Sequence, residues 1–274
     1  MLRHRPPRAL NPPGRPRPER EEDLGGVQVE GLWAVRELLR AGRRVVREVA
    51  VAAGRSETAP LDEILELARL RRVPVRRLTP EELQARAQSE VPQGVIARAE
   101  PLRAVPLADL ASAGADGRPP FLLVFDELTD PQNFGAALRS ALSAGATGAV
   151  VARQRAARVT PSVAKAAAGA VEHLPIALVG GIAAALGTLS RHGVWSVALD
   201  GEGERVLDEV ELLAEPVALV VGAEGRGLAP LVRQRCDVRA RIPLLGPLES
   251  LNAAAAAAVA CFTVARARRG VPTP

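Results

Sequence analysis

The sequence predicts an α/β protein whose larger, C-terminal unit is built on a parallel β-sheet. Short apolar runs, such as 122–125 and 217–221, alternate with segments of helical periodicity. Strands without polar alternation are buried on both faces, which is typical of parallel sheets covered by helices on both sides. A chain of 274 residues, 47% of them apolar, is long enough to fold into one or two such units.

A smaller α/β unit precedes it in the chain. Leucine and valine recur at helical spacing over 32–39, and Gly42 is expected to end that helix. The other segments are assigned on β-branched runs and on prolines that open helices. The expected strands cover 27–30, 45–51, 73–78 and 94–99, and the further helices cover 60–71 and a segment beginning at Pro80.

The larger unit begins abruptly at Phe121 and continues the alternation of strands and helices to its end. Its last helix is rich in alanine, which is typical of a closely packed helix face. No internal repeat of fixed period is present. The expected strands cover 122–125, 149–152, 174–178, 194–199, 217–221 and 238–242, and the expected helices cover 134–144, 160–168, 229–235, 251–268 and a segment from 182.

Composition sets the expected boundaries between these units. Residues 1–24 are rich in proline and arginine without hydrophobic periodicity, so we expect a disordered leader. Residues 1–18 hold five arginines and no acid, which accounts for the whole net charge of +5. This segment is either a solvated leader or a polybasic arm that holds phosphates without specificity, and the two are compatible. The small domain is then expected over 25–100, a linker over 101–119 and the large domain over 120–274.

The composition also excludes several classes of protein. Two cysteines and three scattered histidines supply neither a disulfide framework nor a metal site. With 2% aromatic residues, the chain lacks the rings that base-stacking RNA readers use. The longest apolar runs, 174–189 and 253–265, are too short to span a membrane, and no secretory signal follows the basic N-terminus. We therefore expect a cytoplasmic protein with free thiols and no membrane or metal partner.

Three loops after predicted strands carry polar groups that a connecting loop does not need. They are 130–135, with Arg139 further along the following helix, then 222–227, and then 242–252. Ligands of open parallel sheets bind outside the carboxyl ends of the strands, where these loops lie. Each loop alone also has a structural interpretation: Asn133 and Ser250 as helix N-caps, Asn252 in the first turn of the last helix, the glycines in tight turns and Arg139 as a solvated surface residue.

Taken in order, the three loops resemble the SpoU family of RNA 2′-O-ribose methyltransferases, within the SPOUT superfamily, over residues 120–270. The matching motifs are Asn133-x-Gly135 with Arg139, Gly222-Ala223-Glu224-Gly225-x-Gly227-Leu228, Ile242-Pro243 with Ser250-Leu251-Asn252, and Cys236-Asp237.

The small unit resembles the ribosomal-protein-like, RNA-binding domain that precedes the catalytic domain in one branch of this family. The matching segments are 31–39 and 93–97. A histidine usually stands before the Gln-Gly element of that domain, and here the residue is Pro92. The branch includes enzymes that methylate a guanosine ribose in large-subunit ribosomal RNA.

The resemblance implies a trefoil-knotted catalytic domain that binds S-adenosyl-L-methionine and works as a homodimer. Knots are rare exceptions to ordinary chain topology. Glycines at the knot are expected to allow close backbone approach, and the leucines to cover the adenine ring. The residues that the resemblance assigns to the cofactor are Gly222, Ile242, Leu244, Gly246 and Leu251.

The resemblance also implies the catalytic residues. Asn133 is expected to orient the target ribose, and Glu224, Ser250 and Asn252 to fix the loops and the substrate through hydrogen bonds. Family proposals give deprotonation of the hydroxyl to the arginine that matches Arg139. A guanidinium has a pKa above about 12 and accepts no hydrogen bond, so we expect Arg139 to bind the neighbouring phosphate and stabilise the developing alkoxide.

Three functions remain open at this point. The first is methylation of ribosomal RNA, on a guanosine of the large subunit. The second is the same reaction on tRNA, or on a ribosomal RNA site that confers antibiotic resistance. The third is a catalytically silent RNA-binding protein of ribosome assembly, against which the intact set of polar residues argues.

Overall fold

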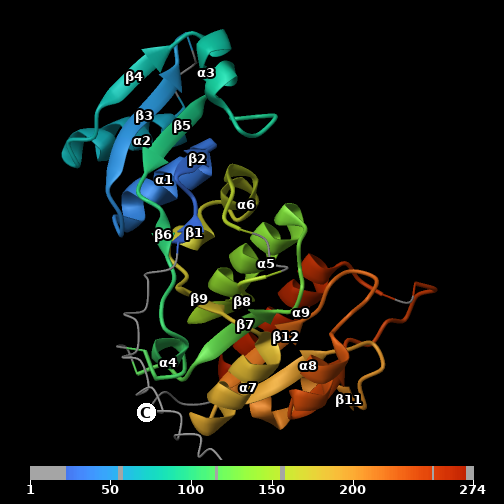
Figure 1. Ribbon diagram of the computed structural model, residues 1–274. Coiled ribbons are helices and arrows are strands. Elements are labelled where there is room, and N and C mark those ends of the chain that lie inside the picture. Colours follow the sequence, from blue (N-terminus) through green and yellow to red (C-terminus); the bar gives the residue numbers. More distant parts are fainter. Residues whose placement is uncertain (1–22, 55–57, 115–116, 155–157, 249, 270–274) are drawn as a thin grey trace, which may run out of the picture.

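The computed structural model describes residues 23–54, 58–114, 117–154, 158–248 and 250–269, and it contains two α/β domains (Figure 1). Most of the predicted leader, 1–22, lies outside the described residues. None of the helices in the described part of the chain combines the length and apolar character needed to cross a bilayer.

The small domain is a four-stranded mixed sheet in the order β2-β5-β3-β4. β5 pairs antiparallel with both β2 and β3, and β3 pairs parallel with β4. Helices α1 and α2 pack together, and Gly42 ends α1 in the left-handed conformation, as predicted. The elements are β2 Gln28–Glu30, α1 Leu32–Ala41, β3 Val46–Ala52, α2 Ala59–Leu70, β4 Val75–Leu78, α3 Pro80–Arg86 and β5 Val95–Ala99.

The large domain contains a seven-stranded sheet in which every pair is parallel, as the apolar strands predict. The strand order is β11-β13-β10-β12-β7-β8-β9. β7 and β12 are fully buried and lie at the centre of the sheet. The strands are β7 Phe121–Phe125, β8 Gly148–Ala152, β9 Ile176–Val179, β10 Trp195–Leu199, β11 Arg205–Val206, β12 Val217–Val221 and β13 Val238–Arg241.

Helices cover this sheet on both faces (Figure 1). α5 packs against α6 and α9 on one face, while α7 and α8 pack against each other on the opposite face. Gly135 allows the contact between α5 and α6, since a Cβ there would lie 2.6 Å from that of Ala166. The helices are α5 Pro131–Ser143, α6 Pro161–Ala166, α7 Ile182–Arg191, α8 Pro230–Arg235 and α9 Ala253–Arg269, with a 3-10 turn η1 at Ala170–Glu172.

The last helix is tied back to the start of the domain through Arg268. Its guanidinium donates to the carbonyl oxygens of Pro119, at 3.0 Å, and of Pro120, at 2.8 Å, and it lies over the ring of Phe121. Burial lowers the pKa of Arg268 to about 10. The C-terminal helix is therefore anchored to the entrance of the central strand β7.

Short elements lie where the sequence predicted a leader and a linker. Strand β1, Asp23–Gly25, pairs antiparallel with β6, Leu102–Arg103, and Leu24 is 7% exposed. Helix α4, Leu107–Leu110, packs on α7 and β9. Residues 23 and 24 thus depart from the predicted disordered leader, because burial of Leu24 and pairing with β6 fix them. The domain boundaries remain predictions.

The two domains are joined by a buried ion pair between Arg44 and Glu172. The guanidinium faces the carboxylate with two hydrogen bonds of 2.5 and 3.0 Å, and the side chains are 6% and 1% exposed. The third nitrogen, Nη1, donates to the carbonyl oxygens of Gly26 and Glu100 at 2.6 Å each. All the charged atoms of the pair are therefore satisfied, which a buried pair requires.

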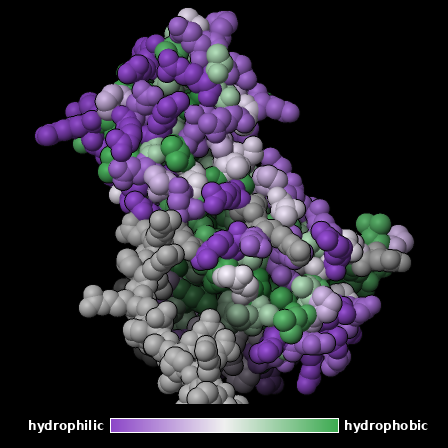
Figure 2. Space-filling model, viewed as in Figure 1, coloured by the Kyte–Doolittle hydropathy of each residue, from purple (hydrophilic) through white to green (hydrophobic). Residues whose placement is uncertain are grey.

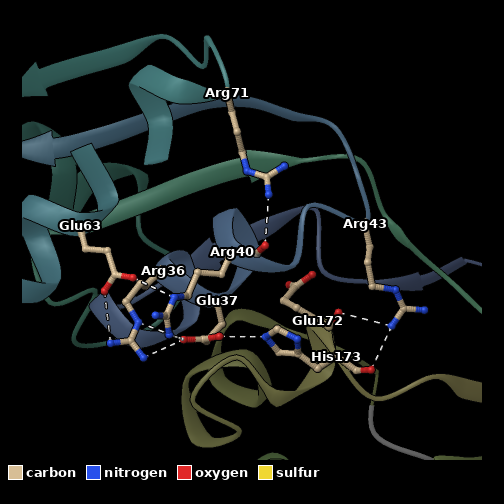
Figure 3. Close-up of polar contacts among 8 residues, drawn as sticks. All are labelled: Arg36, Glu37, Arg40, Arg43, Glu63, Arg71, Glu172 and His173. Atoms are coloured by element: carbon tan, nitrogen blue, oxygen red, sulfur yellow. Dashed lines mark hydrogen bonds and ion pairs between the residues drawn. The ribbon is translucent and has the colours of Figure 1, made fainter. Parts of the chain in front are cut away.

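A second polar cluster extends this contact at the surface (Figure 3). Nε2 of His173 lies 2.8 Å from a carboxylate oxygen of Glu37 on α1, and Arg36 donates to the other oxygen at 2.7 Å. Burial alone would raise the pKa of Glu37, but the hydrogen bonds with Arg36 and His173 hold it below its usual value. Arg43 donates to the carbonyl oxygens of Glu172 and His173. His173 therefore links the two domains.

Candidate active site

An open pocket of about 690 Å³ lies at the carboxyl ends of β10, β12 and β13. Parallel strands expose these ends at one edge, so the second and third predicted loops meet there. The pocket brings together most of the predicted residues: Gly222, Glu224, Ile242, Leu244, Ser250, Leu251 and Asn252 line it. Gly246, Asn133 and Arg139 are not part of the lining.

Asn133 reaches the pocket through Glu224. Its Nδ2 donates a hydrogen bond of 2.6 Å to Oε1 of Glu224, so the loop after β7 is coupled to the loop after β12. The N-cap of α5 is Asp130, whose carboxylate accepts from the backbone N–H of Asn133 at 2.8 Å. The interpretation of Asn133 as the cap is therefore wrong, because the helix starts three residues earlier and leaves its amide available.

The loop after β12 folds back on itself. Ala223 and Gly227 exchange backbone hydrogen bonds of 3.1 and 2.9 Å, and Gly225 and Gly227 have positive φ. A Cβ on Gly222 would lie 2.3 Å from the carbonyl carbon of Gly227, so the absence of a side chain serves the turn itself. Gly246 has no neighbouring atom within 4 Å of a Cβ position, and no packing requires glycine there.

The third loop projects from the body and ends in exposed leucines. Leu245 is 101% exposed and Leu248 is 74% exposed, and Figure 2 shows apolar side chains at the tip of this segment. The N-cap of α9 is Asn252, whose Oδ1 accepts from the N–H of Ala255 at 2.6 Å. The expectation that Ser250 caps this helix is wrong, since the helix begins at Ala253 and Ser250 remains exposed beside the pocket.

Comparison with known proteins identifies the family and the fold. Residues 120–262 match the SpoU rRNA Methylase family, and residues 28–105 match the RNA 2′-O ribose methyltransferase substrate binding family. The chain belongs to the SpoU rRNA methylase family.

Two curated relatives align with this chain over nearly their whole length. The 23S rRNA (guanosine-2′-O-)-methyltransferase RlmB of Pseudomonas putida is 36% identical over 245 residues, which are 88% of this chain and 97% of the relative. The enzyme of the same name from Xanthomonas campestris is 38% identical over 244 residues, which are 88% of this chain and 97% of the relative. The SpoU methyltransferase AviRb of Streptomyces viridochromogenes in complex with AdoMet aligns with a TM-score of 0.74 and 26% identity, covering 89% of this chain and 91% of the other.

The pocket of this SpoU protein fits S-adenosyl-L-methionine, on which the family depends. Its size lies within the range of roughly 300–1,000 Å³ that small-molecule sites span. The lining combines exposed leucines with close backbone at the glycine loop, and Leu244 and Leu251 are 38% and 40% exposed. Apolar side chains left open at the wall of a pocket suit the adenine ring, and the loop backbone suits the polar ends of the cofactor.

Two aspartates that sequence reasoning missed support the pocket. Asp126 directly follows β7 and accepts from the N–H of Ala229 at 2.7 Å, which holds the far end of the glycine loop. Burial raises the pKa of Asp126 above its usual value. Asp200, in the loop after β10, lines the pocket, and Arg233 of α8 lies within 2.7 Å of each of its oxygens. An acid directly follows each of these two apolar strands, which marks both residues as candidates, although the sequence alone does not place them at the pocket.

Arg139 lies on the exposed side of α5, about 9 Å along the helix axis from Asn133. Its guanidinium makes no hydrogen bond or ion pair with the described residues. It is therefore available to a substrate or to another chain, but it does not reach the pocket lining of its own chain.

The remaining chemically reactive groups are structural. Burial raises the pKa of both Cys236 and Cys261 to about 12, so these thiols stay protonated. Asp237 accepts from the N–H and the hydroxyl of Ser196, at 2.8 and 2.6 Å, and so joins β13 to β10. Within the described ranges no group of three or more His, Cys, Asp or Glu side chains is placed to hold a metal ion.

Proposed function

We propose that this chain transfers the methyl group of S-adenosyl-L-methionine to a ribose 2′-hydroxyl of RNA, on a guanosine of large-subunit ribosomal RNA. The observation that carries the proposal is the contact between Asn133 and Glu224, which joins two family motifs at the mouth of a cofactor-sized pocket. The names of the Pseudomonas and Xanthomonas relatives support the choice of a guanosine in 23S rRNA. The match of the small domain to an RNA substrate-binding family supports RNA as the partner.

The residues proposed to hold the cofactor are those of the second and third loops. Bound there, the cofactor supplies an electrophilic methyl group on a sulfonium. Leu244 and Leu251 cover the ring, and the backbone at Gly222 and Ile242 binds the polar parts. Gly246 lies in the projecting part of the loop, and its proposed contribution is to let that loop bend toward the cofactor.

The protein's task is to align the ribose and to stabilise the negative charge that develops on the attacking oxygen. Asn133 donates to Glu224 through its nitrogen, and its Oδ1 remains to accept from a ribose hydroxyl. Ser250 lines the pocket, and its hydroxyl makes no hydrogen bond with the described residues, while Asn252 holds the start of α9 in position. Arg139 binds the phosphate next to the target ribose.

Replacing Asn133 by alanine is expected to lower methyl transfer by about 100-fold, because the ribose loses its orienting group and Glu224 its partner. The rate is measured with labelled donor on unmodified ribosomal RNA and on tRNA, followed by mapping of the 2′-O-methyl position. Gln132→Ala, an exposed neighbour on the same helix, is the matched control and keeps the rate of the native protein.

Calorimetry distinguishes loss of ribose orientation from loss of cofactor binding, because Asn133→Ala is expected to retain its affinity for S-adenosyl-L-methionine. A native protein that binds no S-adenosyl-L-methionine would contradict the proposed enzyme and favour a silent RNA-binding protein. Transfer to tRNA and not to ribosomal RNA would correct the substrate.

The proposal includes a homodimer and the trefoil knot of the family. Support for the dimer comes from α9, where Val259 and Phe262 are 44% and 47% exposed, one turn apart. In such a dimer, the proposed place of Arg139 is at the pocket of the partner chain, because it does not line the pocket of its own chain. The hydrogen bonds that hold Arg268 of α9 at the start of β7 support the return of the chain that a knot requires.

Ribosomal RNA as the substrate supports a cytoplasmic location.

Replacing Phe262 by glutamate is expected to convert the dimer to a monomer, because a charge cannot be buried without a partner in an apolar interface. Light scattering at micromolar concentration measures the mass. Leu231→Glu, at an apolar residue 56% exposed on α8, is the control and should remain dimeric. A native protein that is monomeric under these conditions would contradict the dimer.

A further inference from the structure

A second open cleft, of about 370 Å³, lies between the two domains. One wall belongs to the small domain and includes Gln88 and Arg98, and the other belongs to the large domain and includes Arg158 and Thr160. Its lining shares no residue with the catalytic pocket. Among the described residues no acidic side chain lines this cleft, so its charge is entirely positive.

Both arginines are available to a ligand. The Arg158 side chain is exposed and makes no hydrogen bond or ion pair with the part of the chain that the structure describes. Arg98 is 59% exposed, and its Nε lies 3.9 Å from Glu48, whose carboxylate is closer, at 3.2 Å, to Arg76. An exposed pair at that distance contributes little and does not occupy the guanidinium.

The width of the cleft is fixed by contacts at its floor. A Cβ on Gly25 would lie 2.7 Å from the carbonyl oxygen of Val159, so the domains are in close contact there. The N–H of Val159 donates to the carbonyl oxygen of Leu24 at 3.0 Å. Gly26 is held by Arg44, the same residue that makes the buried ion pair across the domain interface. These contacts fix the backbone next to Arg158 relative to the small domain that carries Arg98.

The polar groups of the small-domain wall are held by a buried carboxylate behind it. Glu30 is fully buried, and it accepts from Nε2 of Gln28 at 2.7 Å and from the N–H of Gln88 at 2.6 Å. These hydrogen bonds satisfy the carboxylate and keep it away from the cleft. The wall therefore presents the exposed amide of Gln88 and Arg98, a combination suited to an anionic, hydrogen-bonding chain.

The cleft leads toward the catalytic loop. Arg158 and Val159 also line a small adjoining cavity, to which the buried Phe134 at the start of α5 contributes. Phe134 follows Asn133, the residue proposed to orient the ribose. Asn133 lies at the start of α5, which follows β7, and Arg158 lies in the loop after β8. These neighbouring parallel strands end at the same edge of the sheet, so a strand held at Arg158 lies on the side of the domain where the chemistry is proposed.

We propose that this interdomain cleft binds the phosphate backbone of the RNA strand that carries the methylated ribose, with Arg98 and Arg158 each contacting a phosphate. The proposal rests on the proposed function and adds a binding site to it. The planar guanidinium fork pairs with two phosphate oxygens at once, and the Thr160 hydroxyl and the Gln88 amide add neutral donors. Phosphate contacts of this kind set the register of a nucleic acid on the protein and carry no base specificity.

The test measures RNA affinity of the full-length protein for an unmodified large-subunit ribosomal RNA transcript, over a range of salt concentrations. Arg98→Ala and Arg158→Ala are each expected to weaken binding about tenfold and to reduce the slope of log K against log salt by about 1. The double variant should lose about 100-fold, and its KM for RNA should rise while kcat at saturating RNA stays within about twofold.

The control is Arg69→Ala, an equally exposed arginine of the small domain that does not line the cleft. Arg158→Gln and Arg98→Gln remove the charge but keep a polar side chain, and unchanged S-adenosyl-L-methionine affinity shows that each variant is folded. Equal losses in Arg69→Ala and in the cleft variants would overturn the site and leave a diffuse charge effect. Native affinity and salt slope in the double variant would overturn it as well.

Failure of the proposed function would give a different experimental result from failure of the proposed RNA-binding cleft. A native protein that binds the transcript and transfers no methyl group would contradict the enzyme, while the affinity measurements still decide the cleft. A native protein that does not bind the transcript would overturn both.

Discussion

Replacing Arg139 by alanine is expected to lower methyl transfer by about 100-fold or more while cofactor affinity and the fold are retained. The residue is exposed on α5, makes no hydrogen bond or ion pair with described residues and lies outside the pocket, so its removal leaves no buried group unpaired. Its proposed role is to bind the phosphate beside the target ribose and to stabilise the forming alkoxide. Rates are measured at saturating cofactor on ribosomal RNA.

Arg139→Lys separates geometry from charge. Lysine keeps the charge as a single point and loses the planar fork, so we expect it to recover only a small part of the rate. Near-native turnover of Arg139→Lys would show that bidentate binding is unnecessary. Near-native turnover of Arg139→Ala would remove the residue from the site.

Mixing two inactive variants tests whether Arg139 acts across the proposed dimer. In a heterodimer of Arg139→Ala and Asn133→Ala subunits, one site combines an intact Asn133 with an intact Arg139 only if the arginine serves the partner's pocket. Activity should then return on mixing. If the arginine serves its own chain, both sites stay defective and no activity returns.

Replacing Arg44 by alanine is expected to lower the free energy of unfolding by about 3–5 kcal/mol, because Glu172 is left buried without a counter-charge. The carbonyl oxygens of Gly26 and Glu100 lose their donor at the same time. Urea unfolding, followed by circular dichroism, measures the change. The control is Arg47→Ala, in the exposed pair with Glu100, which should cost less than about 1 kcal/mol.

A double replacement distinguishes loss of the charge partner from loss of packing. Arg44→Met combined with Glu172→Leu removes both charges and keeps apolar volume, so it should recover most of the stability lost in Arg44→Ala. The carbonyl oxygens of Gly26 and Glu100 lose their donor in both variants, and that part of the cost should remain. A cost below about 1 kcal/mol for Arg44→Ala would contradict the account of a buried, mutually dependent pair.

Periodicity and turn residues predicted the two sheets, most of the helices and the parallel arrangement, because each depends on local pattern. The apolar residues of Val217–Val221 predict a buried strand by themselves, and Gly42 ends α1 as predicted from the end of the helical periodicity. Strands as short as Asp23–Gly25 carry no usable pattern, and β1 exists only because β6 lies beside it. Caps were misplaced for the same local reason: several residues near Asn133 and Ser250 can cap a helix, and the starting turn decides among them.

The sequence predicted which loops form the candidate site, but it did not predict the contacts between their side chains. Order along the chain located Glu224 and Asn252, but the hydrogen bond between Asn133 and Glu224 joins residues 91 positions apart. Strand order explains why Asp200 was missed: β10 lies between β12 and β13, so the loop after it enters the pocket. No pattern within one segment reports that neighbourhood.

The joint made by Arg44 and Glu172 also limits how the two halves of such a protein can be recombined. A chimera that joins this small domain to another catalytic domain would contain a buried arginine that needs a carboxylate at the position of Glu172. The reverse chimera would leave the Glu172 carboxylate buried without a positive partner. Either domain can therefore be exchanged without loss of folding only when the new partner domain supplies the other residue of the ion pair, or when both charged residues are replaced together.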